Sequence, residues 1–354
     1  MENNNTNNTE DNYNNNSNQE TTQNMRKYDT LEGFPEIRGY DFEEKFDFNK
    51  FMESYKNMGI QATNLGVAID IVNQMIADNA FIFLTCTSNM VSSGNREIIK
   101  FLVKHKMIHA ISISEGGIEE DIVKCLKPFI VGRFDIPGRV LFDKSISRIG
   151  NIFVPVDRYT YFEQFTDPFF DRTYEEYKKR GKPFTPSEFI NELGREMERL
   201  ENREESIVYW AYKNNIPIFC PALTDGTIGN FLYFEIVKRK DFYIDIVNDH
   251  KKIIDLVLSC DKAGAIILGG GTAKHYVLNA NIYRDGLDYA VYITTADEHD
   301  ASDSGGDIQE AITWAKIKVN APNVKVRAEA SLVFPLLVAS TFAKKENSQS
   351  PKDA

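Results

Sequence analysis

The sequence predicts an α/β protein with a Rossmann-like, doubly wound and mostly parallel sheet that carries helices on both faces. Short β-branched runs alternate six times with longer amphipathic segments, which is the pattern of repeated strand–turn–helix units. Polar and glycine-rich segments follow the strands, where such sheets bind their ligands. The chain has 354 residues, of which 42% are hydrophobic and 26% charged, so it is long enough for a large core.

The two ends of the chain are predicted to lie outside the folded part. Residues 1–25 contain eleven Asn and neither Lys nor Arg, and such a run buries too little apolar surface to offset its conformational entropy. We therefore expect a disordered Asn-rich tail over residues 1–27 and a flexible C-terminal tail over residues 344–354. Residues 28–343 show no convincing internal repeat and are expected to form one domain.

The elements follow in order from their hydrophobic spacing. Apolar residues recur at helical spacing near residues 48–55 and 65–76. Six strands are predicted over Phe81–Cys86, His109–Ser114, Ile216–Ala222, Ala263–Leu268, Asp288–Thr294 and Val324–Ala328. The helices between and after them are predicted over Arg96–His105, Ile118–Leu126, a segment starting at Thr185, Ile244–Ser259, Ala273–Arg284 and Leu332–Phe342.

Two further segments have their own signals. Thr185, Pro186 and Glu188 have the spacing of an N-cap, a first-turn proline and a capping box, and therefore mark a helix start. Residues 132–183 are rich in Gly, Pro and aromatic residues, and we expect an irregular insertion there.

Composition excludes several classes of function. The formal net charge is −11, which argues against a nucleic-acid surface and favours a cationic ligand or a basic partner. The sequence contains no run of 18 apolar residues, which a membrane-spanning helix would need. No secretory or transit segment is expected either. The four Cys are widely spaced without a CxxC motif, and the 5 His are scattered. We therefore expect free thiols, a cytoplasmic location and no metal site.

The loops after the strands hold the candidate ligand-binding groups. Gly270 lies in a GGG run that opens a helix, so it could receive a phosphate or simply form a tight turn. Asn89 and Ser92 could contact ribose and phosphate or cap a helix. His275 and Asn279 are four residues apart and share a helix face.

Carboxylates are unusually frequent in these loops. An anionic cofactor disfavours so many acids, whereas a linear polycation would pair each ammonium with one of them and lay its methylenes on Trp314. Lys316 closes the same segment and is an amine that could act as a covalent nucleophile if it were neutral. The acids concerned are Glu119, Glu120, Asp225, Asp300, Asp303 and Glu310.

The chain resembles deoxyhypusine synthase from about Ile37 to Ala343. Many distinct segments match in the same order, which is far more specific than any single glycine motif. They include IRGYDF, TSNMVSSGNREIIKFLVKH, GGIEEDIVKCL, PALTDGTIG, IILGGG, KHYVLNANIYRDGLDYAVYITTA, SDSGGDIQEAITWAKI and EASLVFPLLVASTFA.

The resemblance implies an NAD-dependent transferase that assembles as a tetramer with active sites between subunits. The implied reaction oxidises spermidine and passes its aminobutyl group, through an imine on an enzyme lysine, to one lysine of the translation initiation factor 5A precursor. Reduction there yields deoxyhypusine. The implied partners are therefore spermidine, the factor precursor and further subunits, either identical copies or a paralogue.

The resemblance also implies roles for individual residues. Lys316 is the imine-forming nucleophile, and His275 orients the amine where it is oxidised. The implied substrate-binding set is Glu119, Glu120, Asn230, His275, Asn279, Ser302, Asp303, Glu310, Trp314 and Lys316. The implied NAD-binding set is Asn89, Ser92, Ser114, Gly116, Glu120, Asp225, Gly270, Thr295, Ala296, Asp300 and Glu329.

Several positions depart from the family pattern. Asn230 stands where an Asp usually pairs with the polyamine, and Glu115 replaces a small residue near the expected dinucleotide. Glu329 replaces a shorter Asp, and Tyr276 replaces a His. Two alternatives stay open: a weakly active or inactive paralogous subunit that activates a heteromeric deoxyhypusine synthase, and a homospermidine synthase that uses putrescine as acceptor.

Overall fold

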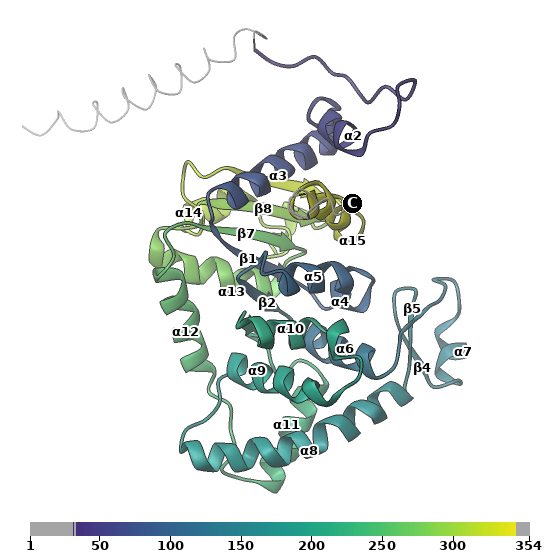
Figure 1. The fold of residues 1–354 in the computed structure, drawn as a ribbon, viewed down its shortest axis with the longest axis vertical. Coiled ribbons are helices and arrows are strands. Elements are labelled where there is room, and N and C mark those ends of the chain that lie inside the picture. The colour runs from purple at the N-terminus through teal and green to yellow at the C-terminus, as the bar shows by residue number, and fades with distance from the viewer. Residues whose placement is uncertain (1–30, 32, 345–354) are drawn as a thin grey trace, which may run out of the picture.

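A six-stranded parallel sheet organises the chain, as predicted (Figure 1). The computed structural model describes residue 31 and residues 33–344, so the predicted tails lie outside the described residues except for Lys344. Along the sheet the order is β6 (Ile218–Phe219), β2 (Ala110–Ile113), β1 (Phe81–Cys86), β7 (Ala263–Leu268), β8 (Tyr289–Thr294) and β9 (Asn323–Arg327). The order moves outward from β1 in both directions, which confirms the doubly wound topology.

Helices cover both faces because neighbouring strand residues point to opposite sides. In β1, Ile82 and Leu84 join the core on one face, whereas Phe83 joins the core on the other. The first core includes residues of α3 (Ile60–Ala77), α5 (Asn95–Lys104), α6 (Glu115–Leu126), α9 (Pro186–Glu196), α10 (Ile207–Asn214) and α15 (Ala330–Ser340). The second includes residues of α12 (Ile246–Leu258), α13 (Gly271–Asn281) and α14 (Ile308–Thr313).

The predicted irregular insertion is wrong, because residues 132–183 are largely regular. A three-stranded antiparallel sheet of β3 (Ile130–Val131), β5 (Ile152–Pro155) and β4 (Ile146–Ile149) projects from the body with α7 (Gly138–Phe142) (Figure 1). It is followed by the 24-residue helix α8 (Asp157–Arg180), which contains Pro168.

Other boundaries differ only locally. The capping box at Thr185 is present, with Glu188 as its partner. The third predicted strand shortens to two residues, and the unpredicted helix α11 (Thr227–Lys238) follows its loop. The remaining α-helices of the described residues are α2 (Phe48–Ser54) and α4 (Asn89–Ser92). In the described part of the chain, no helix has the length and apolar character needed to cross a bilayer.

Candidate active site

Lys316 and Trp314 reach one cavity because α14 stops short of them. The helix ends at Thr313, Trp314 is its C-cap, and Ala315 adopts a left-handed conformation with φ 53°. The Lys316 N–H donates to the Ala311 carbonyl at 2.9 Å. On an unbroken helix, residues two apart would point about 200° from each other, so this turn is what brings both side chains to the same cavity.

The Lys316 amine contacts an oriented imidazole. Its Nζ lies 3.3 Å from His275 Nε2, and the other ring nitrogen, Nδ1, lies 2.9 Å from the Asn279 side-chain amide. Asn279 therefore holds the ring in this orientation. Nζ also lies 5.9 Å from the centre of the Trp314 ring. The arrangement has an amine nucleophile, a group that can exchange its proton, and an aromatic wall.

The cavity around this pair has a volume of about 610 Å³ and is open to solvent on one side. Glu310 supplies a carboxylate, and Trp314, with 62% of its surface exposed, supplies an apolar face. This composition suits a ligand with ammonium groups on an alkyl chain. The lining residues are His250, His275, Asn279, Ile282, Tyr283, Glu310, Trp314 and Lys316.

A buried lysine that sequence reasoning missed supports the neighbouring loop. Lys274 is 3% exposed, donates to the main-chain carbonyl of Asp303 and lies 4.7 Å from the centre of the Tyr292 ring. Burial lowers the pKa of Lys274, and the nearby Asp303 carboxylate opposes that shift. The Asp303 Oδ2 atom is buried without a hydrogen-bond partner. Asp300 and Ser302 are exposed in the same loop, where the Ser302 N–H donates to Asp300 at 2.8 Å and lowers the pKa of that carboxyl.

A second group of predicted residues meets at the carboxyl ends of the strands. Asn89, Thr295 and Glu329 follow β1, β8 and β9 and line a pocket of about 100 Å³. The N–H of the adjacent Ala296 donates to Thr294 at 3.1 Å. At Gly270 an added Cβ would lie 2.3 Å from Ser304 Cα, so the close approach of the 302–306 loop is sufficient reason for glycine there.

The third group is a buried acid cluster on α6, consisting of Glu115, Glu119 and Glu120. Ser92 donates to Glu120, and Tyr159 of α8 donates to Glu119 at 3.3 Å. Burial raises the pKa of Glu120 to about 7. Tyr159 was missed because its helix was not predicted.

The remaining predicted residues surround this cluster. The Ser114 hydroxyl accepts from the Ser88 N–H at 2.9 Å, and a Cβ at Gly116 would lie 3.1 Å from Ser88 Cβ. Asp225 and Asn230 are exposed on either side of the start of α11.

The three groups do not share one cavity within a single chain. The Leu287 N–H donates to the Lys316 carbonyl at 3.0 Å, just before β8 begins, whereas Thr295 follows the end of β8. Leu287 and Thr295 lie on either side of the six-residue strand β8, and their separation along the extended chain is roughly 25 Å. The candidate groups that the sequence places in and near the loops after the strands therefore do not all meet in one cavity of the monomer.

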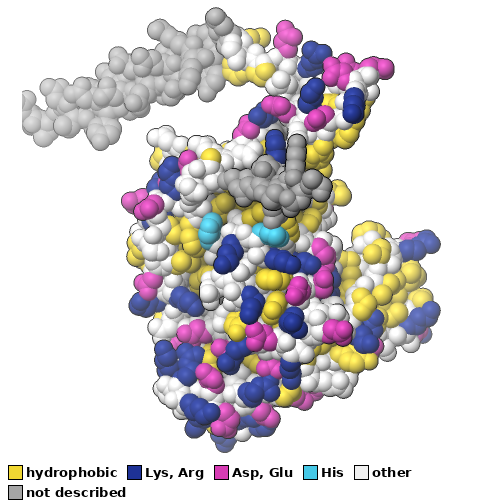
Figure 2. Space-filling model, viewed as in Figure 1, with side chains coloured by type: hydrophobic (Ala, Val, Ile, Leu, Met, Phe, Trp, Pro, Cys, Tyr) yellow, Lys and Arg dark blue, Asp and Glu magenta, His cyan; other side chains and the backbone are white. Residues whose placement is uncertain are grey.

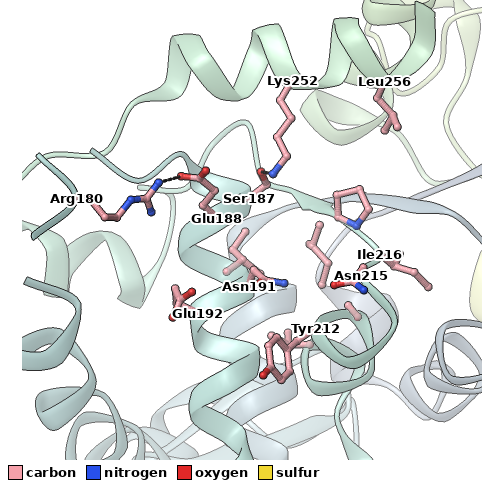
Figure 3. A pocket seen from close by; sticks show the side chains of 15 residues that line it. Arg180, Ser187, Glu188, Asn191, Glu192, Tyr212, Asn215, Ile216, Lys252 and Leu256 are labelled. Carbon is pink, nitrogen blue, oxygen red and sulfur yellow. Dashed lines mark hydrogen bonds and ion pairs between the residues drawn. The ribbon is translucent and has the colours of Figure 1, made fainter. Parts of the chain in front are cut away.

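A further cavity of about 490 Å³ lies among α9, α10 and α12 and contains none of the predicted residues (Figure 3). Its charged groups already have partners. Arg180 pairs with Glu188 at 2.8 Å, and Lys252 donates to the Ser187 hydroxyl at 2.9 Å. In the described part of the chain, no three His, Cys, Asp or Glu side chains are arranged to hold a metal ion.

Fold and site together define a Rossmann-like α/β protein with an amine–imidazole pair in an acid- and aromatic-lined cavity. The family model for deoxyhypusine synthase matches residues 50–341. The chain therefore belongs to the deoxyhypusine synthase family and is an enzyme, a transferase.

Individual relatives cover nearly the whole chain. A probable deoxyhypusine synthase from Dictyostelium discoideum is 44% identical over 98% of this chain and 97% of its own length. A probable deoxyhypusine synthase from Thermococcus gammatolerans is 47% identical, over 89% and 96% respectively. A crystal structure of an Entamoeba histolytica protein assigned to the deoxyhypusine synthases is 32% identical, covers 87% of this chain and 97% of its own, and superimposes with a TM-score of 0.57.

Proposed function

We propose that this enzyme transfers the aminobutyl group of spermidine, through an imine on Lys316, to a lysine of the translation initiation factor 5A precursor, using NAD. The observation that carries the proposal is the 3.3 Å contact between Lys316 Nζ and His275 Nε2, in a cavity that also presents Glu310 and Trp314. Membership of the deoxyhypusine synthase family supports the same chemistry.

Each side chain of the cavity has a different role in binding spermidine. Glu310 pairs with an ammonium group of spermidine, and the Trp314 ring packs against its methylenes. Asn279 holds His275 so that Nε2 faces the amine. These contacts place the carbon of spermidine that is to be oxidised near Lys316 Nζ.

In the proposed transfer, one bond forms at Lys316 Nζ for each bond that breaks. When the C–N bond of spermidine has been oxidised to C=N, the unprotonated Nζ attacks that carbon. The bond to the old nitrogen breaks, 1,3-diaminopropane leaves, and His275 relays the proton that Nζ loses. The aminobutyl group is then an imine on Lys316. The amine of the target lysine displaces Nζ in the same way, and reduction of the new C=N completes deoxyhypusine.

The residues at the carboxyl ends of the strands carry functional groups that can bind a dinucleotide. The Asn89 amide and the Thr295 hydroxyl can bond phosphate or ribose oxygens, and Glu329 can accept from ribose hydroxyls. When bound, NAD would accept the hydride from spermidine and return it in the last step. The pocket in one chain is about 100 Å³, smaller than ligand sites usually are, so we propose that a second subunit completes it.

Two features support assembly of several chains into the active form. Lys316 and Thr295 lie at opposite ends of β8, so a complete site is most simply built from groups of two chains. Extensive apolar surface is also uncovered in the monomer. It lies on α11, where Tyr233, Phe234, Ile236 and Val237 are 48–64% exposed. It also lies on the lobe of β3–β5 and α7 (Figure 2). We propose a homotetramer or, with a paralogue, a heterotetramer.

The reaction is tested by incubating the purified protein with NAD, radiolabelled spermidine and the factor precursor, with borohydride added to trap the imine. Wild type is expected to be labelled, and Lys316→Arg to lose the label completely because guanidinium cannot form the imine. Lys318→Arg is the matched control, since Lys318 pairs with Asp288 at 2.6 Å outside the cavity. Label on Lys316→Arg would exclude Lys316 as the nucleophile.

The same assay separates the alternatives. Transfer only after a paralogue is added would establish the heteromeric form, which the buried Glu115 and the uncharged Asn230 favour. Transfer to putrescine, with none to the precursor, would establish a homospermidine synthase. We also propose a cytoplasmic location, which the four free cysteines support.

A further inference from the structure

The acid cluster on α6 is buried without a counter-ion. Glu115 is 0% exposed, and Glu119 and Glu120 are each 5% exposed. Among residues 33–344, no Lys, Arg or His lies within ion-pair distance of any of these three carboxyl groups. The nearby Lys124 ammonium instead donates to the carbonyls of Val91, Ser92 and Ser93. The cluster therefore holds three buried carboxyl groups without an ion-pair partner in the described part of the chain, and the charge of Lys124 acts only on Glu120 from a distance.

Among the three acids, Glu115 has the environment that stabilises a negative charge least. Its Oε1 accepts one hydrogen bond, from the Ile228 N–H at 3.1 Å, and its Oε2 is buried without a partner. A buried carboxylate with an open oxygen is costly, and such groups usually take up a proton instead. Burial first, and then the charge of Glu119, raise the pKa of Glu115 to about 9.

The same glutamates hold the start of α11. The N-cap of α11 is Gly226, which has no side chain to cap the helix. Glu119 accepts from the Thr227 N–H at 2.7 Å, and Glu115 accepts from the next N–H. Two acids of α6 thus replace the missing cap, and they hold in place the loop and first turn that carry Asp225 and Asn230. Two charged acids at one helix end would repel each other, whereas one neutral and one charged acid would not.

We propose that Glu115 and Glu119 form an acid–carboxylate pair that clamps the amino end of α11. We further propose that Glu115 releases its proton when, across the subunit contact proposed above, an ammonium group of the polyamine reaches the cluster. No covalent bond changes, because the proton leaves to solvent and the ligand's charge takes its place. The clamp stands on the contacts alone. The exchange rests on the proposed function, since that function supplies the polyamine.

The charged and titratable groups around Glu115 favour this exchange. Glu119 and Glu120 face it from α6, and Tyr159 of α8 and Cys220, which follows β6, interact with it electrostatically. The charges of Glu119 and Glu120 oppose ionisation of Glu115, whereas burial raises the pKa of Tyr159 and of Cys220 and keeps both groups neutral. A cation arriving among them reverses the balance, because an opposite charge nearby lowers the pKa of a carboxyl.

The clamp is tested on the ligand-free protein by infrared spectroscopy of the carboxylic-acid C=O stretch during a pH titration. In wild type one neutral carboxyl should persist above about pH 8, where Glu120 has ionised, and disappear by about pH 10. That signal should be absent in Glu115→Gln and unchanged in the control Glu163→Gln, an exposed acid of α8. A wild type without a neutral carboxyl at pH 8 would overturn the clamp.

A second variant tests the same pair with Glu115 in place. A Cβ at Gly226 would lie 1.4 Å from Glu115 Oε2, and Gly226 is otherwise extended with φ 175°. Gly226→Ala should therefore displace the carboxyl and abolish the high-pH acid signal. Hydrogen exchange of the Ile228 amide should quicken in Gly226→Ala but not in Glu115→Gln, whose amide oxygen still accepts. An unchanged signal in Gly226→Ala would also count against the clamp.

Calorimetry tests the exchange. Spermidine is titrated into each protein near pH 8 in two buffers of different ionisation enthalpy, which gives the protons released on binding. Wild type should release about one proton more than Glu115→Gln, and the ligand's own proton exchange cancels in that difference. Equal numbers would overturn the exchange. Absence of spermidine binding to wild type would overturn the proposed function instead, while the infrared titration still decides the clamp.

Discussion

At the scale of single residues, the geometry brings together five groups that sequence and resemblance singled out: His275, Asn279, Glu310, Trp314 and Lys316. Their spacing along the chain and the family motifs were enough to nominate them, and their roles stay predictions. Lys274 could not be nominated, because a lysine on an amphipathic helix usually faces water. Its burial against Tyr292 depends on how the 302–306 loop packs.

Asn279 is expected to act by positioning His275. Asn279→Ala should lower kcat about fivefold, since it removes one hydrogen bond worth roughly 1 kcal/mol from an oriented ring. Steady-state kinetics measure the effect. A wild-type kcat in Asn279→Ala would rule out the positioning role.

Glu115 should make stability depend on pH. Its pKa is raised from 4.5 to about 9 in the folded protein, so between these values the native state holds a proton that the unfolded chain has lost. The stabilisation is complete below about pH 4.5 and is lost as pH rises through about 9. Thermal unfolding of wild type and Glu115→Gln across this range should show a smaller decline in Tm for the variant. Parallel curves would contradict the expectation.

At the scale of elements, the strands with long β-branched runs were predictable and the irregular ones were not. β1, β7 and β8 were found to within one residue, because both of their faces are buried and their apolar runs are continuous. The prediction of an irregular segment failed at α8 because Pro168 lies inside that helix, whereas proline usually ends a helix. In α11, Gly229 and exposed apolar residues removed the amphipathic pattern.

The turn after α14 makes a prediction at this scale. Ala315 has φ 53°, which costs a residue with a Cβ about 1 kcal/mol or more. Ala315→Gly should raise the free energy of unfolding by roughly 0.5–1 kcal/mol, and Ala315→Val should lower it by about 1–2 kcal/mol. Chemical denaturation measures both. A loss of stability in Ala315→Gly would show that the turn is not strained.

At the scale of the whole molecule, the uncovered apolar surfaces support the proposal that the complete active site needs more than one chain. Sequence patterns place residues on elements, but they do not reveal which surface another chain covers. The predicted ligand groups at the carboxyl edge and those around Lys316 therefore looked like one site in the sequence and lie apart in the monomer. The single domain over residues 28–343 stays a prediction.

The α11 surface should control assembly. Phe234 is 61% exposed, and Phe234→Asp should place a charge in a subunit contact, which is strongly unfavourable without a partner. Light scattering should give a smaller particle than wild type, with loss of transferase activity and unchanged circular dichroism. The control is Lys179→Asp, which introduces an aspartate at an exposed position of α8. A Phe234→Asp protein of unchanged mass would exclude α11 from the contact.

The exposed ring at the end of α14 has an optical consequence. The chain has 2 Trp. Trp210 is held on α10, where its indole N–H donates to the Glu204 carbonyl at 2.9 Å and Lys104 covers the ring. Trp314 forms part of the cavity wall. Replacing Trp210 by Phe therefore leaves a single emitter beside Lys316, and its fluorescence would report, without any label, when the cavity fills and empties during a catalytic cycle.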